Sequence, residues 1–575
     1  MNKRVIKFVL DILKPHKFRI SIIFMCMLVI SAFGIIYPLL QREIFDNGIM
    51  MNDLDVVFRY TALILGIFVV EQFLSFLQFI HYEYINRQIP YELMHKAVDH
   101  SINLKVSYHK DNNFMKTIQN VYMDIGNIAQ IANANLLQAF VSLFKIIGGM
   151  IGLILIDWRL TLFILVIIPL ELIIKQLISF KRSKYMTMLM KANEKFSIWL
   201  GETFMNVEII KLWNLQNRRR KEFNTLQKDM MKVETQMEYL DNYSALSSQV
   251  LSMIFTHGLN VLGAILILGD ELTIGGLFAF TAYSMFVMQP ISLLADIAYR
   301  FSSSMPAFER FLNYFDHETE DFEGVHLEST CRIEELSFEG VAFGYSDENV
   351  VLKEITFSVS KGEKVAFVGV NGSGKTSIVN LILRFLEPDT GEIKLNGRNV
   401  QSIALNNYRD LFSVMNQNVS LFEGSIRSNV DILGNLSKDQ IHEYLDLATA
   451  TKFVEQLSNG IDTHIGYYGS KLSGGERQKI SLARAFSKKG QILILDEATA
   501  SFDLKAENEF DRYIAENEFY EIVIVVSHRK NILKKLDKIF IIDHGVIVDS
   551  GTFEDLMIRN DYFNTILEQK KEELG

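Results

Sequence analysis

Apolar residues are distributed unevenly along the chain, with six long apolar runs in the first half and only short ones in the second. Each long run has about 20 residues and few charges, enough for one helix to cross the ~30 Å hydrocarbon core of a bilayer. The first run lacks the small-residue cleavage site of a secretory signal, so we expect it to be retained. The pattern predicts membrane spans at residues 20–40, 57–80, 136–156, 160–180, 245–268 and 276–295.

The segments between the spans differ greatly in length. Residues 82–135 and 181–243 are long and polar, with the periodicity of helices, so we expect them to prolong the spans beyond the membrane. Each is expected to turn in a short crossing helix, near residues 108–116 and near residues 204–211.

Charge sets the orientation of the spans. Lysine and arginine are concentrated at the N-terminus and after the fourth span, whereas the short connections carry mainly acidic residues. Because basic flanks remain in the cytoplasm, the N-terminus, both long loops and the second half of the chain are expected on the cytoplasmic side of the cell membrane. Residues 5–13 have one apolar face surrounded by lysines, which predicts a helix lying on the inner membrane surface.

Several ionisable side chains fall inside the spans, where they are costly unless they face water or a partner. Two of them, Glu171 and Lys175, are four residues apart and can pair on one helix face. Two interpretations stay open for the set: a polar cavity that opens toward the cytoplasm, or ion pairs that join helices. The residues concerned are Glu71, Lys145, Glu171, Lys175 and His257.

The character of the chain changes after the sixth span. Residues 316–335 are acidic and irregular, which is typical of a linker. Beyond them, short apolar strands alternate with helical stretches, as in an α/β domain. The sequence therefore predicts a transmembrane domain at residues 1–315, a linker at 316–335 and a nucleotide-binding domain at 336–575.

A glycine-rich loop in the second half follows the apolar run 365–368 and precedes a helix. A strand that enters a helix through such a loop offers unpaired backbone N–H groups to phosphates. Lys375 can reach the β and γ oxygens of ATP, and the hydroxyl of Thr376 can ligate Mg²⁺. A glycine-rich turn with a surface lysine is the alternative, which this context disfavours. The loop consists of Gly369, Val370, Asn371, Gly372, Ser373, Gly374, Lys375 and Thr376, followed by Ser377.

Two further patterns strengthen the prediction of a nucleotide site. The apolar run 491–495 ends in Asp496, a candidate Mg²⁺ ligand, and Glu497, a candidate general base for the attacking water. A second helix begins with glycines, which predicts a bare N-terminus and so a second anion site. One nucleotide does not need both anion sites of one chain, so each ATP is expected between two subunits. This second site comprises Leu472, Ser473, Gly474, Gly475 and Glu476.

The order of these motifs resembles that of ATP-binding cassette exporter half-transporters, and the resemblance covers nearly the whole chain. It implies that residues 369–376 are the Walker A loop and residues 472–478 the family signature, with Asp496 as the Walker B aspartate and Glu497 as the catalytic glutamate. It also implies that Tyr345 stacks on adenine, that Gln417 lies near Mg²⁺ and the attacking water, and that His528 contacts the γ-phosphate. Asp503 is implied in the ATP site through the D-loop.

Two motifs depart from the family pattern. The D-loop reads Ala500-Ser501-Phe502-Asp503, and Phe502 is expected to alter the contact across a dimer. The X-loop position reads Gly466-Tyr467-Tyr468-Gly469 and lacks the acidic residue of exporters, which leaves coupling at that point open.

Composition agrees with a membrane transporter. A net charge of −10 argues against a nucleic-acid partner, and two cysteines are too few for a disulfide framework or a thiolate metal site. We therefore expect a multi-pass membrane ATPase that exports a peptide, drug or lipid by alternating access of a homodimer. An ATP-gated channel or regulator and an importer on the same fold remain alternatives, and the sequence does not identify the cargo.

Overall fold

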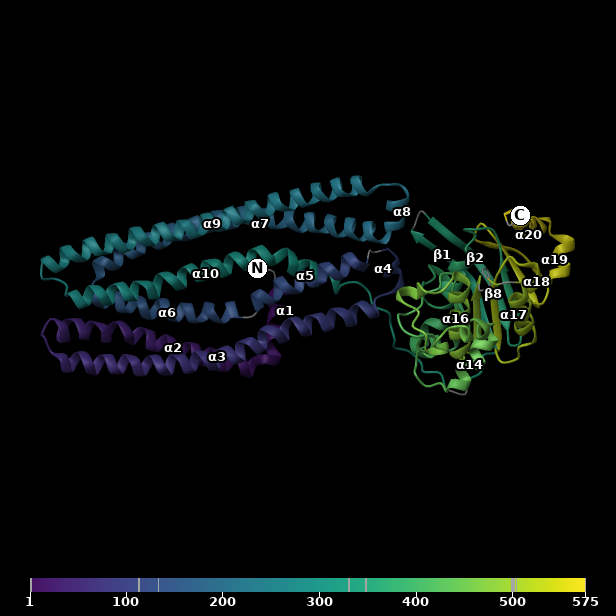
Figure 1. Ribbon diagram of the computed structural model, residues 1–575, viewed down its shortest axis with the longest axis horizontal. Helices are drawn as coiled ribbons and strands as arrows, with labels where there is room; N and C mark the ends of the chain where they lie inside the picture. Colours follow the sequence, from purple (N-terminus) through teal and green to yellow (C-terminus); the bar gives the residue numbers. More distant parts are fainter. Residues whose placement is uncertain are drawn as a thin grey trace. The chain divides into compact units, whose positions relative to one another are not determined.

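The computed structural model describes residues 3–111, 114–132, 134–328, 331–346, 349–497, 502 and 504–573. The chain forms two compact units, which we call the helical unit and the sheet unit (Figure 1). The helical unit consists of Met1–Leu104 and Tyr108–Thr319, and the sheet unit of Lys105–Ser107 and Glu320–Gly575. The main division, between Thr319 and Glu320, falls within the segment predicted as a linker.

Six of the helices are long and apolar enough to cross a membrane, by length and composition over the described residues, which confirms the expected number of long apolar helices. Several continue well past the apolar run: α9, for example, has 53 residues, or about 80 Å at 1.5 Å per residue. The helices are α1 (Lys3–Leu13), α2 (Lys17–Glu43), α3 (Leu54–Asn103), α4 (Val106–Asp111), α5 (Phe114–Ala132), α6 (Ala134–Ile156), α7 (Trp158–Met205), α8 (Val207–Leu212), α9 (Gln216–Leu268) and α10 (Ile274–Tyr314).

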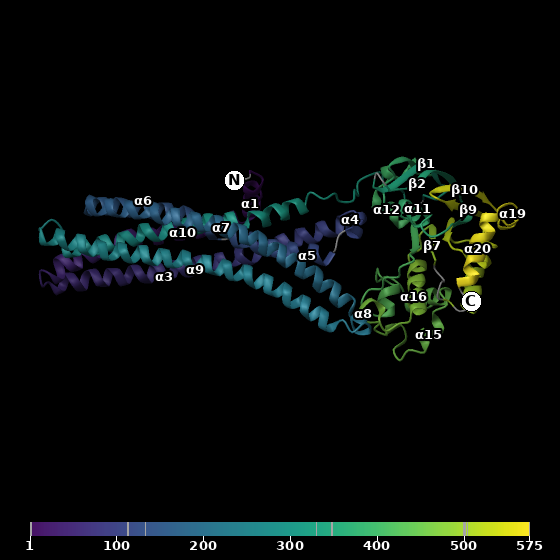
Figure 2. The same cartoon turned by 90° about the horizontal axis from the view of Figure 1, so that it is seen from above.

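The long helices pack side by side in pairs. The views agree that α2 runs beside α3 and that α7 runs beside α9 (Figures 1 and 2), and α10 packs against α6. Side-chain caps start several of them: Asp53 accepts backbone N–H bonds at the start of α3, and Asp157 does so at the start of α7. The expected crossing helices occur as the six-residue helices α4 and α8. Residues 112 and 113, inside the first expected crossing helix, lie outside the described residues.

Residues 5–13, which were expected to lie on the membrane surface, belong to α1, and that position stays a prediction. Val5 and Val9 of α1 are buried in a cluster that includes Phe308 and Phe311 of α10. The apolar stripe of α1 thus packs against side chains of the protein itself. The amphipathic pattern of α1 showed that one of its faces must be buried. It did not show that this face packs against α10, which lies about 300 residues further along the chain.

A network of ion pairs and hydrogen bonds, buried except at the half-exposed Asp296, joins three helices of the helical unit. Lys175 lies 3.9 Å from Glu171, as the four-residue spacing predicted, but it donates to Asp296 of α10 at 2.9 Å. Glu171 accepts hydrogen bonds from Ser248 of α9, at 3.2 Å, and from Ser292 of α10. Glu171 and Lys175 are both more than nine-tenths buried, which favours pairing between helices for these two residues.

The other three ionisable residues in the spans are placed differently. Glu71 of α3 and Lys145 of α6 interact through their charges. The Lys145 ammonium also lies 5.5 Å from the ring centre of Phe286 on α10. His257 is exposed on α9. Whether any of the five lines a cavity stays a prediction.

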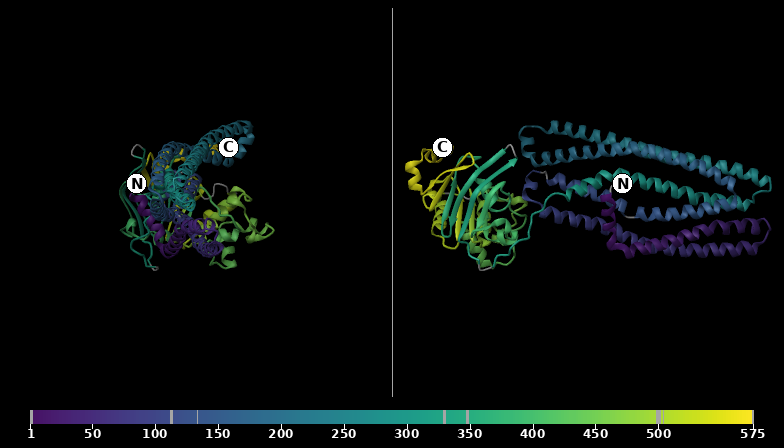
Figure 3. Two further views of the ribbon diagram at one scale, coloured as in Figure 1. Left: turned by 90° about the vertical axis from the view of Figure 1, so that its left-hand side faces the viewer. Right: turned by 180° about the vertical axis from the view of Figure 1, so that it is seen from behind.

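The sheet unit contains a mainly parallel six-stranded sheet and an antiparallel four-stranded sheet (Figure 3). The strand orders are β10-β9-β3-β8-β7-β6 and β2-β1-β4-β5, with only β10 antiparallel in the larger sheet. The strands are β1 (Glu335–Ser346), β2 (Asn349–Ser360), β3 (Lys364–Val368), β4 (Thr390–Leu395), β5 (Arg398–Asn399), β6 (Phe412–Met415), β7 (Ile492–Asp496), β8 (Ile522–Val526), β9 (Lys538–Asp543) and β10 (Val546–Gly551).

Alternate residues of the central strands enter two different apolar cores. In β3, Val365 and Phe367 pack with the four-stranded sheet and with α11 (Lys375–Ile382), whereas Ala366 and Val368 pack with helices on the opposite face. Since both faces of the sheet are covered, these strands are continuous apolar runs. The remaining helices are α12 (Leu405–Asp410), α13 (Ile426–Val430), α14 (Lys438–Leu447), α15 (Thr451–Glu455), α16 (Gly474–Ser487), α17 (Leu504–Glu516), α18 (Lys530–Leu533), α19 (Phe553–Arg559) and α20 (Asp561–Glu573).

Candidate nucleotide-binding site

Four predicted site segments leave the six-stranded sheet at one edge. Strands β3, β6, β7 and β8 are parallel, so their carboxyl ends meet at the same side, where ligands bind in open α/β sheets. The phosphate loop follows β3, Gln417 follows β6, Asp496 and Glu497 end and follow β7, and His528 follows β8.

The phosphate loop requires glycine at two points. A Cβ on Gly369 would lie 2.1 Å from the carbonyl oxygen of Ile542. Gly374 has φ 109°, and a Cβ there would lie 2.5 Å from the side chain of Leu352. Any other residue would therefore push the loop away from the strand or strain its backbone.

The ammonium of Lys375 is held inside this loop. Lys375 is 8% exposed, and its Nζ donates to the carbonyl oxygens of Gly369 at 2.6 Å and of Val370 at 2.9 Å. The residue before α11 is Gly374, which has no side chain to cap the helix, so the helix start itself does not bring a capping group to its first turn. A buried cation beside an uncapped helix start fits the β and γ phosphates of ATP. Thr376 is exposed on the first turn of α11.

The two acidic residues at the end of β7 differ in their surroundings. Asp496 is 4% exposed, and burial together with the charge of Glu497 raises its pKa to about 6, against an opposing effect of Lys375. Glu497 has φ 51°, and its backbone N–H donates to Val526 at 3.0 Å. Gln417 donates from Nε2 to the Glu497 carboxylate at 2.9 Å. The fold thus brings together a glutamine and an acid that are 80 residues apart.

Tyr345 lies beside the first turn of α11. Its hydroxyl is 3.4 Å from the Ser377 hydroxyl, and its ring packs edge-on against Phe343 with centroids 5.0 Å apart. The side chain is 55% exposed. An exposed aromatic ring in this place is available to stack on a base, and this role stays a prediction.

His528 is held between two anchored neighbours. Ser527 is buried, and its hydroxyl accepts the backbone N–H of Arg529 at 3.2 Å. This short turn places His528 at the same sheet edge as Glu497. Its contact with a γ-phosphate stays a prediction.

The start of α16 is not bare, which corrects the interpretation of residues 472–476. The Ser473 hydroxyl accepts the Glu476 N–H at 3.3 Å, and the Glu476 carboxylate accepts the Ser473 N–H at 2.7 Å. This capping box was readable from serine and glutamate three residues apart. Figure 2 shows α16 on the part of the sheet unit that carries α15, and α11 on the part that carries β1 and β2.

The residues that depart from the family motifs pack against aromatic neighbours in the structure. The ring of Phe502 packs within its own chain, with its centroid 6.1 Å from that of Phe510 on α17. Asp503 lies outside the described residues, and its role stays a prediction. Tyr467 and Tyr468 are 68% and 62% exposed, and their ring centroids are 4.4 Å apart. Two exposed tyrosines thus occupy the place of the expected acid.

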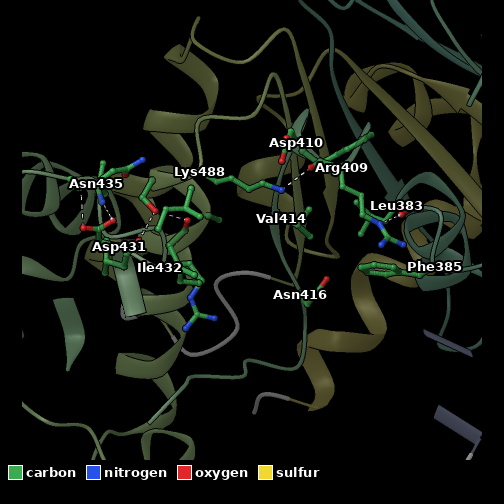
Figure 4. A pocket seen from close by; sticks show the side chains of 17 residues that line it. Leu383, Phe385, Arg409, Asp410, Val414, Asn416, Asp431, Ile432, Asn435 and Lys488 are labelled. Carbon is green, nitrogen blue, oxygen red and sulfur yellow. Dashed lines mark hydrogen bonds between the residues drawn. The ribbon is translucent and has the colours of Figure 1, made fainter. Parts of the chain in front are cut away.

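A separate cavity of about 420 Å³ lies in the sheet unit (Figure 4). Its wall includes Val414 of β6 and Asn416, directly before Gln417. Lys488 crosses part of it and donates to the Arg409 carbonyl at 2.7 Å. None of the described residues predicted to bind nucleotide lines this cavity. Sequence motifs did not indicate it, because its wall combines segments from residue 383 to residue 488.

Both units match models of known protein families. A family model for the ABC transporter transmembrane region matches residues 20–291, and a model for the ABC transporter itself matches residues 352–500. An ATP-dependent lipid A-core flippase of Alcanivorax borkumensis is 27% identical, over 84% of this chain and 83% of that protein. The flippase of Ralstonia nicotianae is 26% identical, over 96% and 94%.

A solved structure shares the fold. A bacterial Atm1-family ABC exporter with ATP bound superposes with a TM-score of 0.85, covering 96% of this chain and 98% of the exporter, at 18% identity. A helical unit with six apolar spans joined to an α/β unit is therefore the architecture predicted from the sequence, and the fold prediction is confirmed.

Proposed function

The chain belongs to the ABC transporter family, as a half-transporter with a transmembrane region and an ATP-binding domain in one polypeptide, and from this premise we propose that a homodimer of it moves a lipid across the membrane. The matches to this family identify the chain as an exporter, a multi-pass membrane protein and an ATPase coupled to transport. The cargo, the dimer and the roles of single residues belong to the proposal.

The observation that carries the lipid cargo is the match to proteins named as lipid A-core flippases over 84% and 96% of this chain. The described spans agree with it in one respect. None of the residues in the most apolar window of α3 is buried within the single chain, so this helix has apolar side chains that can meet lipid or a partner chain. A cargo that is already dissolved in the bilayer can reach such a helix without first entering water.

For hydrolysis, each ATP would be bound between two chains. The loop around Lys375 would hold the β and γ phosphates, and the Ser473 end of α16 from the partner would close the site. Glu497 would take a proton from the water that attacks the γ-phosphorus, giving ADP and phosphate. The Gln417–Glu497 hydrogen bond supports this, because it aims the carboxylate from a neighbouring strand.

A magnesium ion fits the same edge of the sheet. Thr376, Gln417 and Asp496 offer a hydroxyl, an amide and a carboxylate oxygen, which are the hard ligands that Mg²⁺ prefers. When bound, the ion would neutralise charge on the phosphates. Because protonated Asp496 cannot serve as an anionic ligand, its raised pKa implies weaker binding of the ion below about pH 6.

Transport would follow from closure of the dimer around ATP. ATP shifts the protein toward the closed state only through its higher affinity for that state. The crossing helices α4 and α8 would carry the movement into the spans, and hydrolysis would release it. By the positive-inside rule the N-terminus and the sheet unit would be cytoplasmic.

The cargo is tested in vesicles that contain the purified protein and a panel of fluorescent lipids, peptides and drugs. We expect a lipid of the panel to raise ATP hydrolysis about threefold or more and to change leaflet with ATP, since cargo that favours the closed state favours turnover. Vesicles with the Glu497→Gln variant are the matched control. Stimulation by peptides or drugs alone would contradict a lipid cargo, and ATP-dependent ion conductance would favour the channel alternative.

A further inference from the structure

Arg529 joins two segments of the sheet unit that are far apart in sequence. It follows His528 directly and precedes α18, and its backbone N–H donates to the Ser527 hydroxyl. Its guanidinium forms ion pairs with Glu507 and with Asp511 of α17, the latter at 3.3 Å. Arg529 is therefore bound by its backbone on one side of His528 and by its side chain to another helix.

The ion pairs of Arg529 are largely shielded from water, so water cannot easily take the place of the guanidinium. Asp511 is fully buried, and the side chains of Glu507 and Arg529 are 16% and 24% exposed. The Asp511 Oδ1 atom has no hydrogen-bond partner among the described residues. Burial raises the pKa of Asp511, while Arg529 and, to a smaller degree, Lys535 lower it. The carboxylate thus depends on the guanidinium for its charge balance.

We propose that Arg529 is a positioning residue for ATP hydrolysis, which holds the turn containing His528 against α17 so that His528 keeps its place at the sheet edge. This inference rests on the proposed role of His528. A planar guanidinium can bridge two carboxylates, which a lysine ammonium does with less directional constraint. The neighbours of His528 are then fixed, and Arg529 acts on hydrolysis through the position of His528.

The test compares hydrolysis by the full-length protein with and without this connection. Arg529→Met combined with Asp511→Asn removes the guanidinium without leaving a charge at the fully buried position 511, and only Glu507, which is 16% exposed, loses its cation. We expect kcat to fall about tenfold and KM for ATP to change less than about twofold, because a displaced group costs rate more than ground-state binding. Arg529→Lys, which keeps the charge, is expected to recover part of the rate. Arg512→Met is the control, because Arg512 is an exposed arginine on α17, the helix that carries Asp511.

A double-mutant cycle separates positioning from simple structural support. On a His528→Ala background, measured by single-turnover hydrolysis, the Arg529→Met and Asp511→Asn pair should cause almost no further loss, because its effect passes through His528. The same tenfold loss on that background, or an unchanged kcat in the first comparison, would overturn the proposal. If His528→Ala alone leaves kcat unchanged, the proposed role of His528 fails and this inference with it, whereas the ATPase assigned to Lys375 and Glu497 stands.

Discussion

Replacing Glu497 with glutamine is expected to lower ATP hydrolysis by a factor on the order of 10²–10⁴ while leaving ATP binding intact. Glutamine has nearly the same shape and can still meet Gln417, which lies 2.9 Å from the carboxylate in the native chain. It cannot take a proton from the attacking water. The closed dimer should therefore accumulate with ATP, which is measured as the rate of phosphate release and the amount of nucleotide retained after gel filtration.

The control for this variant is Glu518→Gln, which makes the same chemical change at an exposed position of the sheet unit. It should hydrolyse ATP at the native rate. If Glu497→Gln also does so, Glu497 is not the general base. If Glu497→Gln loses hydrolysis and nucleotide retention together, it damages the site itself, and the separation of binding from chemistry proposed above fails.

The second large effect is expected in the helical unit. Lys175→Met removes the cation of the buried ion-pair network and leaves Glu171, which is 4% exposed, without its charge partner. Breaking a buried pair in this way costs about 3–5 kcal/mol of folding free energy in soluble proteins. We expect a clearly lower midpoint of thermal unfolding in detergent and a reduced yield of folded protein.

A paired substitution checks the cause of that loss. Glu171→Gln removes the unpaired charge and keeps a group that can bond to the hydroxyls of Ser248 and Ser292. The variant with both substitutions should therefore regain much of the stability lost by Lys175→Met alone. An equal loss in both variants would show that packing of the lysine stem, rather than charge balance, stabilises the three helices.

The sequence predicted those parts of the site whose functional residues are neighbours along the chain. The loop around Lys375 is fixed by neighbours in the chain, and the strand before Asp496 is one apolar run, so both were readable. Gln417 and Glu497 meet only because β6 and β7 are adjacent, which a motif does not encode. The order of the motifs identified Gln417 and Glu497 as candidate site residues through the family resemblance. Their contact became visible only in the fold.

The features that the sequence missed depend on distant partners. The four-residue spacing predicted the Glu171–Lys175 pair, but Asp296, the closer partner of Lys175, is 121 residues away. The apolar face of α1 was readable, whereas its cover by α10 was not. The Ser473–Glu476 capping box is the exception, because the three-residue spacing shows it directly.

Mixed dimers test most directly whether two chains share each ATP. Two differently tagged chains, both with Glu497→Gln, are co-purified and their retained ATP is counted. Ser473→Asp serves as the signature change, because aspartate still caps a helix but repels phosphate. If sites are shared, a Lys375→Ala chain paired with a Ser473→Asp chain keeps one ATP per dimer, and a chain with both changes paired with an otherwise unchanged chain keeps none. The reverse result would contradict the account, because it requires each chain to hold its own nucleotide.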